Sequence, residues 1–167
     1  FVQVAFYLGY FVMAFPAALF IQRYSFKSGV LLGLTLYAVG ALTFIPAKMS
    51  GMFIAFLPAY FIMTCGLSFL ETSCNPYIYS MGSDDTATRR LNFAQAFNPL
   101  GAITGAWIAL TYVSASLHPA DSKTRGNLMN SVPEQFEAIK THDLDILVQP
   151  YLYIGIVVLL LLDLSLH

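Results

Sequence analysis

The Glu71 carboxylate lies in an apolar setting. Glu71 follows the residues Leu67 to Leu70, midway along a stretch long and apolar enough to cross a bilayer as a helix. A charge at mid-membrane costs about 2.5–3.5 kcal/mol on insertion scales, so this side chain must face protein or water, or carry a proton. Such a carboxyl can take up a proton on one side of a membrane and release it on the other. The structural alternative is an acid held by hydrogen bonds inside a helix bundle.

Two polar residues share the helix face of this acid. Ser68 precedes Glu71 by three residues and Asn75 follows it by four, spacings that bring side chains together on a helix. Asn75 also directly precedes Pro76, which removes a backbone hydrogen bond. We expect the Asn75 amide to form a hydrogen bond with the backbone there in preference to contacting a ligand. Asn75 would then support the site without binding the ligand itself.

A second polar stripe follows later in the chain. Asn92, Gln95 and Asn98 recur every three residues, and their amides offer the paired donors and acceptors that suit sugar hydroxyls. Phe97 and Trp107 offer apolar faces for a sugar ring, or simply pack. Amides also join membrane helices at about 1 kcal/mol each, which is the alternative role. We expect Gln95 and Asn98 to bind substrate together with Glu71, and Asn92 to support them.

Composition favours a membrane protein over an enzyme or a nucleic-acid binder. Of 167 residues, 57% are hydrophobic and 10% charged, with mean hydropathy +0.68, whereas soluble domains carry about 25% charged residues. The net charge of -1 lacks the basic excess that nucleic acids require. The sequence has no phosphate loop, and His118, His142 and His167 have no metal-ligand spacing. We expect no enzymatic activity, no cofactor and no metal.

The apolar stretches predict an all-α, multi-pass membrane protein. Each is close to the 20 or so residues that a helix needs to cross the hydrocarbon core. The predicted helices cover residues 1–22, 28–45, 52–79, 89–116 and 150–166, with a polar connector over 117–149. Within the connector, Ser131 and Glu134 have the spacing of a capping box, which predicts a short helix from Val132 to about Thr141.

The basic residues of the short loops predict the orientation. Arg23 and Lys27 flank one loop, and Arg89 and Arg90 flank another on the same side, whereas the short opposite loop has only Lys48. Cytoplasmic loops are enriched in Lys and Arg, so the first two loops are predicted to be cytoplasmic. The first helix then begins outside without a signal peptide, and we expect a helix to precede it.

Glycine and proline positions indicate bent, closely packed helices. Pro16, Pro58, Pro76 and Pro99 lie inside the predicted spans, where each interrupts the backbone pattern. The spacings Gly29-x-x-x-Gly33 and Gly101-x-x-x-Gly105 permit close contact between helices of the same chain.

Four groups of residues give the chain a family resemblance. They are Gly9-Tyr10-Phe11 with Pro16; Lys27-Ser28-Gly29 with Gly33 and Gly40; Leu70-Glu71-Thr72 with Asn75-Pro76; and Arg90-Leu91-Asn92-Phe93-Ala94-Gln95 with Phe97-Asn98 and Gly101. Together they resemble the fucose permease group of the major facilitator superfamily, which also holds glucose/galactose permeases. The wider superfamily usually has an Asp before the arginine of the first cytoplasmic loop, where this chain has Gln22.

The resemblance implies a fold and an activity. The chain would be helices two to six of a twelve-helix transporter, that is, a partial amino-terminal lobe over residues 1–167 that lacks the first helix and the second lobe. Glu71 would couple proton and sugar movement, and Gln95 and Asn98 would line the cavity. The acid at position 71 favours the fucose permeases, since the glucose/galactose permeases tend to lack it.

We therefore expect import of a fucose-like or other monosaccharide by proton symport with alternating access. The expected place is the bacterial cytoplasmic membrane. The sequence leaves open the identity of the sugar and the coupling ion, because carboxyl and amide oxygens suit sodium as well. The alternatives are a membrane sugar sensor that does not transport, and an exporter of apolar compounds on the same fold, which the amide stripe disfavours.

Overall fold

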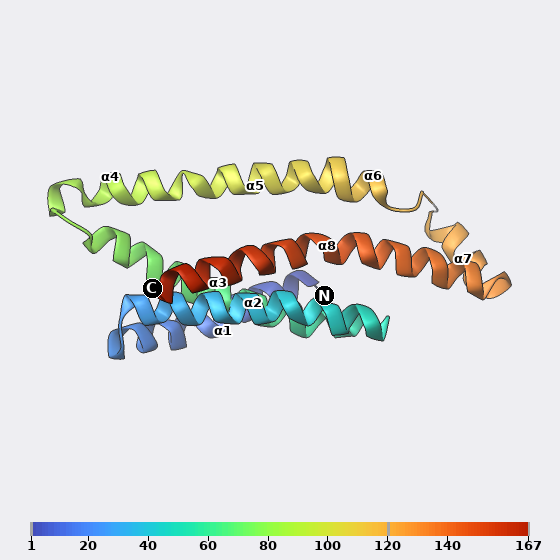
Figure 1. The fold of residues 1–167 in the computed structure, drawn as a ribbon, viewed down its shortest axis with the longest axis horizontal. Helices are drawn as coiled ribbons and strands as arrows, with labels where there is room; N and C mark the ends of the chain where they lie inside the picture. Colours follow the sequence, from blue (N-terminus) through green and yellow to red (C-terminus); the bar gives the residue numbers. More distant parts are fainter. Residues whose placement is uncertain (1, 120, 167) are drawn as a thin grey trace.

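A computed structural model describes residues 2–119 and 121–166 (Figure 1). Every regular element in these residues is helical, which confirms the all-α fold class. The elements are α1 (Val2–Arg23), α2 (Phe26–Ser50), the 3-10 turn η1 (Phe53–Ala55), α3 (Phe56–Ser80), α4 (Asp84–Gln95), α5 (Phe97–Ile108), the π-helical turn η2 (Ala109–Val113), α6 (Ser114–Ser116), α7 (Ser122–Ser131) and α8 (Pro133–Leu166).

The helices α1, α2, α3 and α8 form a bundle in which α2 and α3 make the closest contact. A Cβ atom on Gly40 would lie 2.5 Å from the backbone nitrogen of Met63, and one on Gly66 would lie 2.5 Å from that of Tyr37. Gly33 also packs against α3, since a Cβ there would lie 3.0 Å from the carbonyl oxygen of Gly66. Glycine thus lets the two backbones touch, as small residues do between membrane helices.

The core of the bundle lies between α2, α3 and α8. One cluster joins Phe44, Ala59, Met63 and Val148. A second joins Leu34, Ala38 and Val158 along the α2–α8 contact. Since these residues come from three helices, burial of their side chains holds α8 against the α2–α3 pair.

The second helix is longer than predicted. It runs from Phe26 to Ser50 and includes Pro46, where the sequence analysis ended it. A single proline removes only one helical hydrogen bond, and packing of Phe44 and Ala47 in the core maintains the helix on both sides. The helix ends instead at Gly51, whose φ of 61° is left-handed and whose N–H donates to the Lys48 carbonyl.

The elements α4, α5, η2 and α6, here called the arm, lie in line along one side of the molecule (Figure 1). The sequence analysis predicted one helix over 89–116, but α4 already starts at Asp84 and the helix is interrupted at Ala96. Pro99 explains the interruption, because it cannot donate a hydrogen bond to the Gln95 carbonyl.

The arm is held at its two ends. At one end, the Arg90 guanidinium donates to the carbonyls of Ile78 and Tyr79 at 3.4 and 2.9 Å, capping the last turn of α3. At the other, the Tyr112 hydroxyl donates to Gln149 Oε1 of α8 at 2.8 Å. Between them, every residue from 95 to 112 is exposed. Gly101 and Gly105 have no neighbouring atom within 4 Å of a Cβ, so their expected helix contact is not made within the described residues.

The predicted connector 117–149 is largely helical, and its boundary with the last span was wrong. It contains α7, and α8 already begins at Pro133 and continues to Leu166. Ser131 does not cap a following helix; it ends α7, and its hydroxyl donates to the Asn127 carbonyl at 2.6 Å. Proline at the first position of α8 is favourable because its missing N–H would have no helical partner there.

Buried Asp143 joins the connector to α8. Its carboxylate accepts from Arg125 of α7 at 2.6 Å and from the backbone N–H of His118 at 2.9 Å. These contacts hold α7 on the polar end of α8, within the stretch predicted as a polar connector. The helix predicted from Val132 to about Thr141 is present as the first turns of α8, without Ser131 as its cap.

Four helical segments in the described residues are long and apolar enough to cross a membrane. They cover Phe6–Arg23, Phe26–Ser50, Phe53–Ser80 and Pro133–Leu166. The predicted fourth span is missing from this set because the break at Ala96 divides the arm into shorter helices.

Candidate functional site

The Glu71 carboxylate has a partner on a neighbouring helix. The Tyr10 hydroxyl of α1 donates a hydrogen bond to Glu71 Oε2 of α3. Tyr10 could not be predicted as a site residue from sequence, because the contact joins two helices and follows no local spacing. Its position inside the Gly9-Tyr10-Phe11 motif was the one available signal.

Close packing of α1 on α3 sets this contact. A Cβ on Gly9 would lie 3.0 Å from the Phe61 carbonyl oxygen, so the helices meet at a glycine. One residue on, the backbone carbonyl of Tyr10 accepts a hydrogen bond from buried Ser68 at 3.2 Å. Ser68 lies three residues before Glu71, so it fixes the α1 backbone opposite the acid.

Glu71 faces outward from the bundle. The residue is exposed within the described part of the chain, whereas Ser68 and Ser73 near it are buried. A hydrogen-bonded but accessible carboxylate can exchange a proton, which an acid sealed in the core cannot do as readily.

The Asn75 amide does not patch the backbone as expected. Within residues 2–119 and 121–166 its side chain forms no hydrogen bond, and α3 continues through Pro76 to Ser80. Asn75 is half-buried one turn after Glu71, so its amide remains available beside the acid.

The three amides of the second stripe lie on the arm, and all are exposed. Asn92 lines a shallow hollow with Arg89 and Arg90 near the α3–α4 turn. Gln95 and Asn98 lie on either side of the break at Ala96, so the amides do not follow one uninterrupted helix. In the described residues none of their side chains makes a hydrogen bond, and the structure does not bring them into contact with Glu71.

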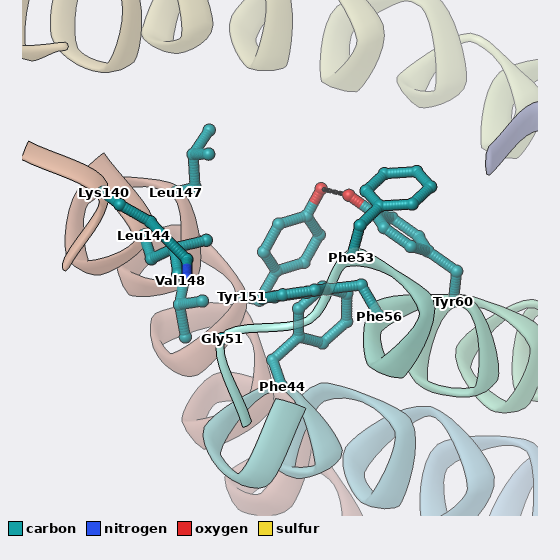
Figure 2. Close-up of a pocket in the computed structure, with 10 residues that line it drawn as sticks. All are labelled: Phe44, Gly51, Phe53, Phe56, Tyr60, Lys140, Leu144, Leu147, Val148 and Tyr151. Atoms are coloured by element: carbon teal, nitrogen blue, oxygen red, sulfur yellow. Dashed lines mark hydrogen bonds between the residues drawn. The ribbon is translucent and has the colours of Figure 1, made fainter. Parts of the chain in front are cut away.

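A cavity of about 340 Å³ lies elsewhere, among the ends of α2 and α3 and the middle of α8 (Figure 2). Half of its lining residues are aromatic, and the lining includes neither Glu71 nor the amides. Sequence analysis did not identify it, because its residues come from parts of the chain about a hundred positions apart.

The fold and the polar residues define a class of protein. Long apolar helices pack through glycines, one span carries an accessible acid with a tyrosine partner, and a neighbouring helical arm presents exposed amides. These are features of a multi-pass membrane transporter.

The chain belongs to the Major Facilitator Superfamily, whose family model matches residues 1–118. It is an integral membrane protein, and its relatives are transporters rather than enzymes.

The relatives confirm the resemblance to the fucose permease group. The chain is 52% identical over 159 residues to the L-fucose-proton symporter of Haemophilus influenzae, covering 94% of this chain and 37% of that protein. It is 40% identical over 161 residues to the L-fucose-proton symporter of Escherichia coli, covering 95% of this chain and 36% of that protein. A glucose/galactose transporter of Brucella abortus is 38% identical over 100 residues, covering 60% of this chain and 24% of that protein.

A solved structure has the same fold. The crystal structure of FucP, a Major Facilitator Superfamily transporter, in the outward conformation matches with a TM-score of 0.84 at 36% identity, over 99% of this chain and 39% of that one. The chain thus spans little more than a third of the length of the symporters it matches.

Proposed function

We propose that the complete protein imports L-fucose or a related monosaccharide together with a proton, in the bacterial cytoplasmic membrane. The observation that carries this proposal is the Glu71 carboxylate on a spanning helix, which accepts a hydrogen bond from the Tyr10 hydroxyl. The L-fucose-proton symporters among its relatives support the sugar and the ion.

In the proposed cycle, Glu71 takes up a proton from outside while the sugar binds Gln95 and Asn98. The two lobes then rock about the site, and sugar and proton leave inside. Tyr10 donates to the ionised carboxylate, and this bond weakens when Glu71 carries a proton, because a neutral carboxyl is a poorer acceptor than a carboxylate.

The remainder of the protein would complete the site. Residues 95–112 of the arm are exposed, and apolar side chains such as Phe97 and Trp107 are 60% and 64% exposed. We propose that a further helix lies between the arm and Glu71, and that a second lobe closes the cavity. Both would come from the part of the relatives' length that this chain does not span.

Uptake into vesicles separates this proposal from its alternatives. The complete protein is reconstituted, and labelled L-fucose, galactose and glucose are supplied with an imposed proton gradient or a sodium gradient. We expect accumulation of L-fucose driven by the proton gradient. A sugar sensor would bind sugar without accumulation, a sodium symporter would respond to sodium instead, and an exporter of apolar compounds would accumulate none of the sugars.

Asn98→Ala should weaken sugar binding more than Asn92→Ala. Asn92 lies near the α3–α4 turn, and Asn98 is about 9 Å further along the arm at 1.5 Å per residue. Loss of the Asn98 amide leaves a sugar hydroxyl unpaired, which costs about 1–3 kcal/mol, or roughly 5- to 150-fold in Kd. Isothermal titration of the purified complete protein measures both. Equal losses in the two variants would indicate general damage to helix packing.

Tyr10→Phe should slow proton-driven uptake while leaving sugar affinity within about twofold. The lost hydrogen bond to a charged group is worth about 1.5–3 kcal/mol, so we expect a decrease in the uptake rate of at least roughly tenfold. The matched control is Tyr7→Phe, one turn earlier on α1, whose side chain is 68% exposed. A Tyr10→Phe variant as fast as Tyr7→Phe would show that the hydroxyl does not act on Glu71.

A further inference from the structure

The aromatic cavity of Figure 2 has a rigid, apolar interior. Phe44 and Tyr151 stack with ring centroids 4.2 Å apart, and the Tyr60 and Tyr151 hydroxyls are 2.7 Å apart and bond to each other. This bond uses one of the two O–H groups, so a single hydroxyl donor remains in a lining whose other polar side chain is Lys140. The cavity therefore favours a mainly apolar occupant, and 340 Å³ is enough for part of a small-molecule ligand.

A polar hollow of about 300 Å³ adjoins this cavity, and the two share Gly51, Lys140 and Leu144 in their walls. The hollow adds Lys48, Ser50, Glu137 and Thr141, together with the apolar side chain of Met49. Gly51 makes the junction possible, because the Lys140 ammonium lies 3.2 Å from where a Cβ on Gly51 would be. An apolar cavity joined to a polar hollow fits one amphipathic molecule.

The order of charges distinguishes among amphiphiles. Lys140 lies on the wall that the two spaces share, and Glu137 lies only in the polar hollow. The cation is therefore nearer to the apolar cavity than the anion is. The Lys140 ammonium contacts the Glu137 carboxylate at 3.1 Å, and Glu137 is 60% exposed. An exposed pair of this kind is weak and can exchange for other partners. The other lysine of the polar hollow, Lys48, forms an ion pair with Asp145. The charges that line the hollow therefore include no unpaired lysine among the described residues.

This junction lies where a membrane surface would be. The 25 residues of α2 span about 37 Å, slightly more than the hydrocarbon core, so its end at Gly51 reaches the interface. Large apolar residues around the Gly51 turn are exposed there, with Met49 at 82%, Phe53 at 62% and Ile54 at 68%. Tyrosines such as Tyr60 and Tyr151 favour this level of a bilayer.

We propose that this site binds a phospholipid whose headgroup carries both a phosphate and a primary amine, as in phosphatidylethanolamine. One acyl chain occupies the aromatic cavity, the phosphate binds Lys140, and the amine binds Glu137. The order of chain, phosphate and amine in the lipid matches the order of cavity, Lys140 and Glu137 in the protein. An anionic headgroup would leave its phosphate beside Glu137 with no amine to neutralise that acid.

A tryptophan reporter tests the proposal in the complete protein. Trp107 and every other tryptophan are replaced by phenylalanine, and a reporter is introduced by Phe53→Trp at the cavity. The control reporter is Leu164→Trp, on α8 away from the cavity and 72% exposed. Each protein is placed in phosphatidylcholine vesicles with increasing amounts of phosphatidylethanolamine or phosphatidylglycerol that carry brominated chains, and quenching gives relative lipid affinities.

We expect phosphatidylethanolamine to be preferred over phosphatidylcholine by roughly fivefold at Phe53→Trp and not at Leu164→Trp. A primary ammonium donates hydrogen bonds to Glu137, whereas the quaternary ammonium of phosphatidylcholine has no N–H, and a fivefold preference is about the net value of one hydrogen bond. Glu137→Gln should remove this preference and replace it with one for phosphatidylglycerol, because the amine then has no acid to bind and Lys140 has no acid beside it. Lys140→Gln should not create a preference for phosphatidylglycerol, because the phosphate then has no cation to bind.

Three results would overturn the proposal. Equal preference at the two reporters would mean that the cavity selects no lipid. Preference for phosphatidylglycerol in the protein with Glu137 intact would mean that the headgroup site is cationic. Absence of quenching at Phe53→Trp would mean that another part of the protein covers the mouth.

Discussion

Glu71→Gln should abolish accumulation of sugar against its gradient while retaining exchange of sugar across the membrane. Glutamine has nearly the same shape and still accepts a hydrogen bond from Tyr10, but it cannot carry a proton. Uphill uptake depends on that proton, whereas exchange needs only binding and rocking of the lobes. We expect the rate of uphill uptake to fall at least about 100-fold and the rate of exchange to fall less than about tenfold. Labelled L-fucose in vesicles of the complete protein measures both.

Asp163→Asn provides the comparison. Asp163 is an exposed acid near the end of α8, and its carboxylate has no hydrogen bond or ion pair within residues 2–119 and 121–166. This variant should accumulate sugar at nearly the normal rate. If Glu71→Gln accumulated sugar as well as Asp163→Asn does, Glu71 would be a structural acid.

Gly40→Ala should strongly destabilise the protein. The new methyl group would lie 2.5 Å from the Met63 nitrogen and 2.7 Å from its Cα, which are backbone atoms and cannot rotate away. Overpacking typically costs about 1–3 kcal/mol, and the backbone clash places this substitution at the upper end. Thermal unfolding of the purified complete protein should show a decrease in Tm of at least about 5 °C.

Gly126→Ala is the matched control for the same chemical change. Gly126 lies inside α7, where no atom lies within 4 Å of a Cβ. Alanine favours a helix over glycine by about 0.8–1.0 kcal/mol, so this variant should be as stable as the parent or more so. Equal destabilisation by the two substitutions would contradict the close α2–α3 contact.

Apolar length and turn chemistry were enough to predict most of the helices. The helices predicted over 1–22 and 52–79 agree with α1 and with η1–α3 to within a residue or two. The end of α2 was predicted at Pro46, but the helix continues to Ser50. Core packing on both sides of Pro46 outweighs the one hydrogen bond that the proline removes. A short helix was predicted over 132–141 and a separate span over 150–166, whereas α8 runs unbroken from Pro133 to Leu166. The two were not joined in the prediction because the first turns of α8 are polar and contact α7.

The candidate site was only partly accessible from sequence. The cost of a charge in a membrane identified Glu71, but its Tyr10 partner depends on how α1 packs on α3 through Gly9. The amide spacing predicted one stripe over Asn92, Gln95 and Asn98, and Pro99 interrupts the helix inside it. The role of these amides in binding sugar remains a prediction. The aromatic cavity could not be predicted, because it requires the tertiary placement of α8.

Sugar-driven proton movement tests the proposed symport most directly. Vesicles containing the complete protein are suspended in weakly buffered medium without ion gradients, L-fucose is added outside, and a pH electrode records the external medium. We predict an immediate rise in external pH that tracks L-fucose uptake and is absent in Glu71→Gln. Uptake of L-fucose with no change in external pH, in the parent protein, would contradict proton symport.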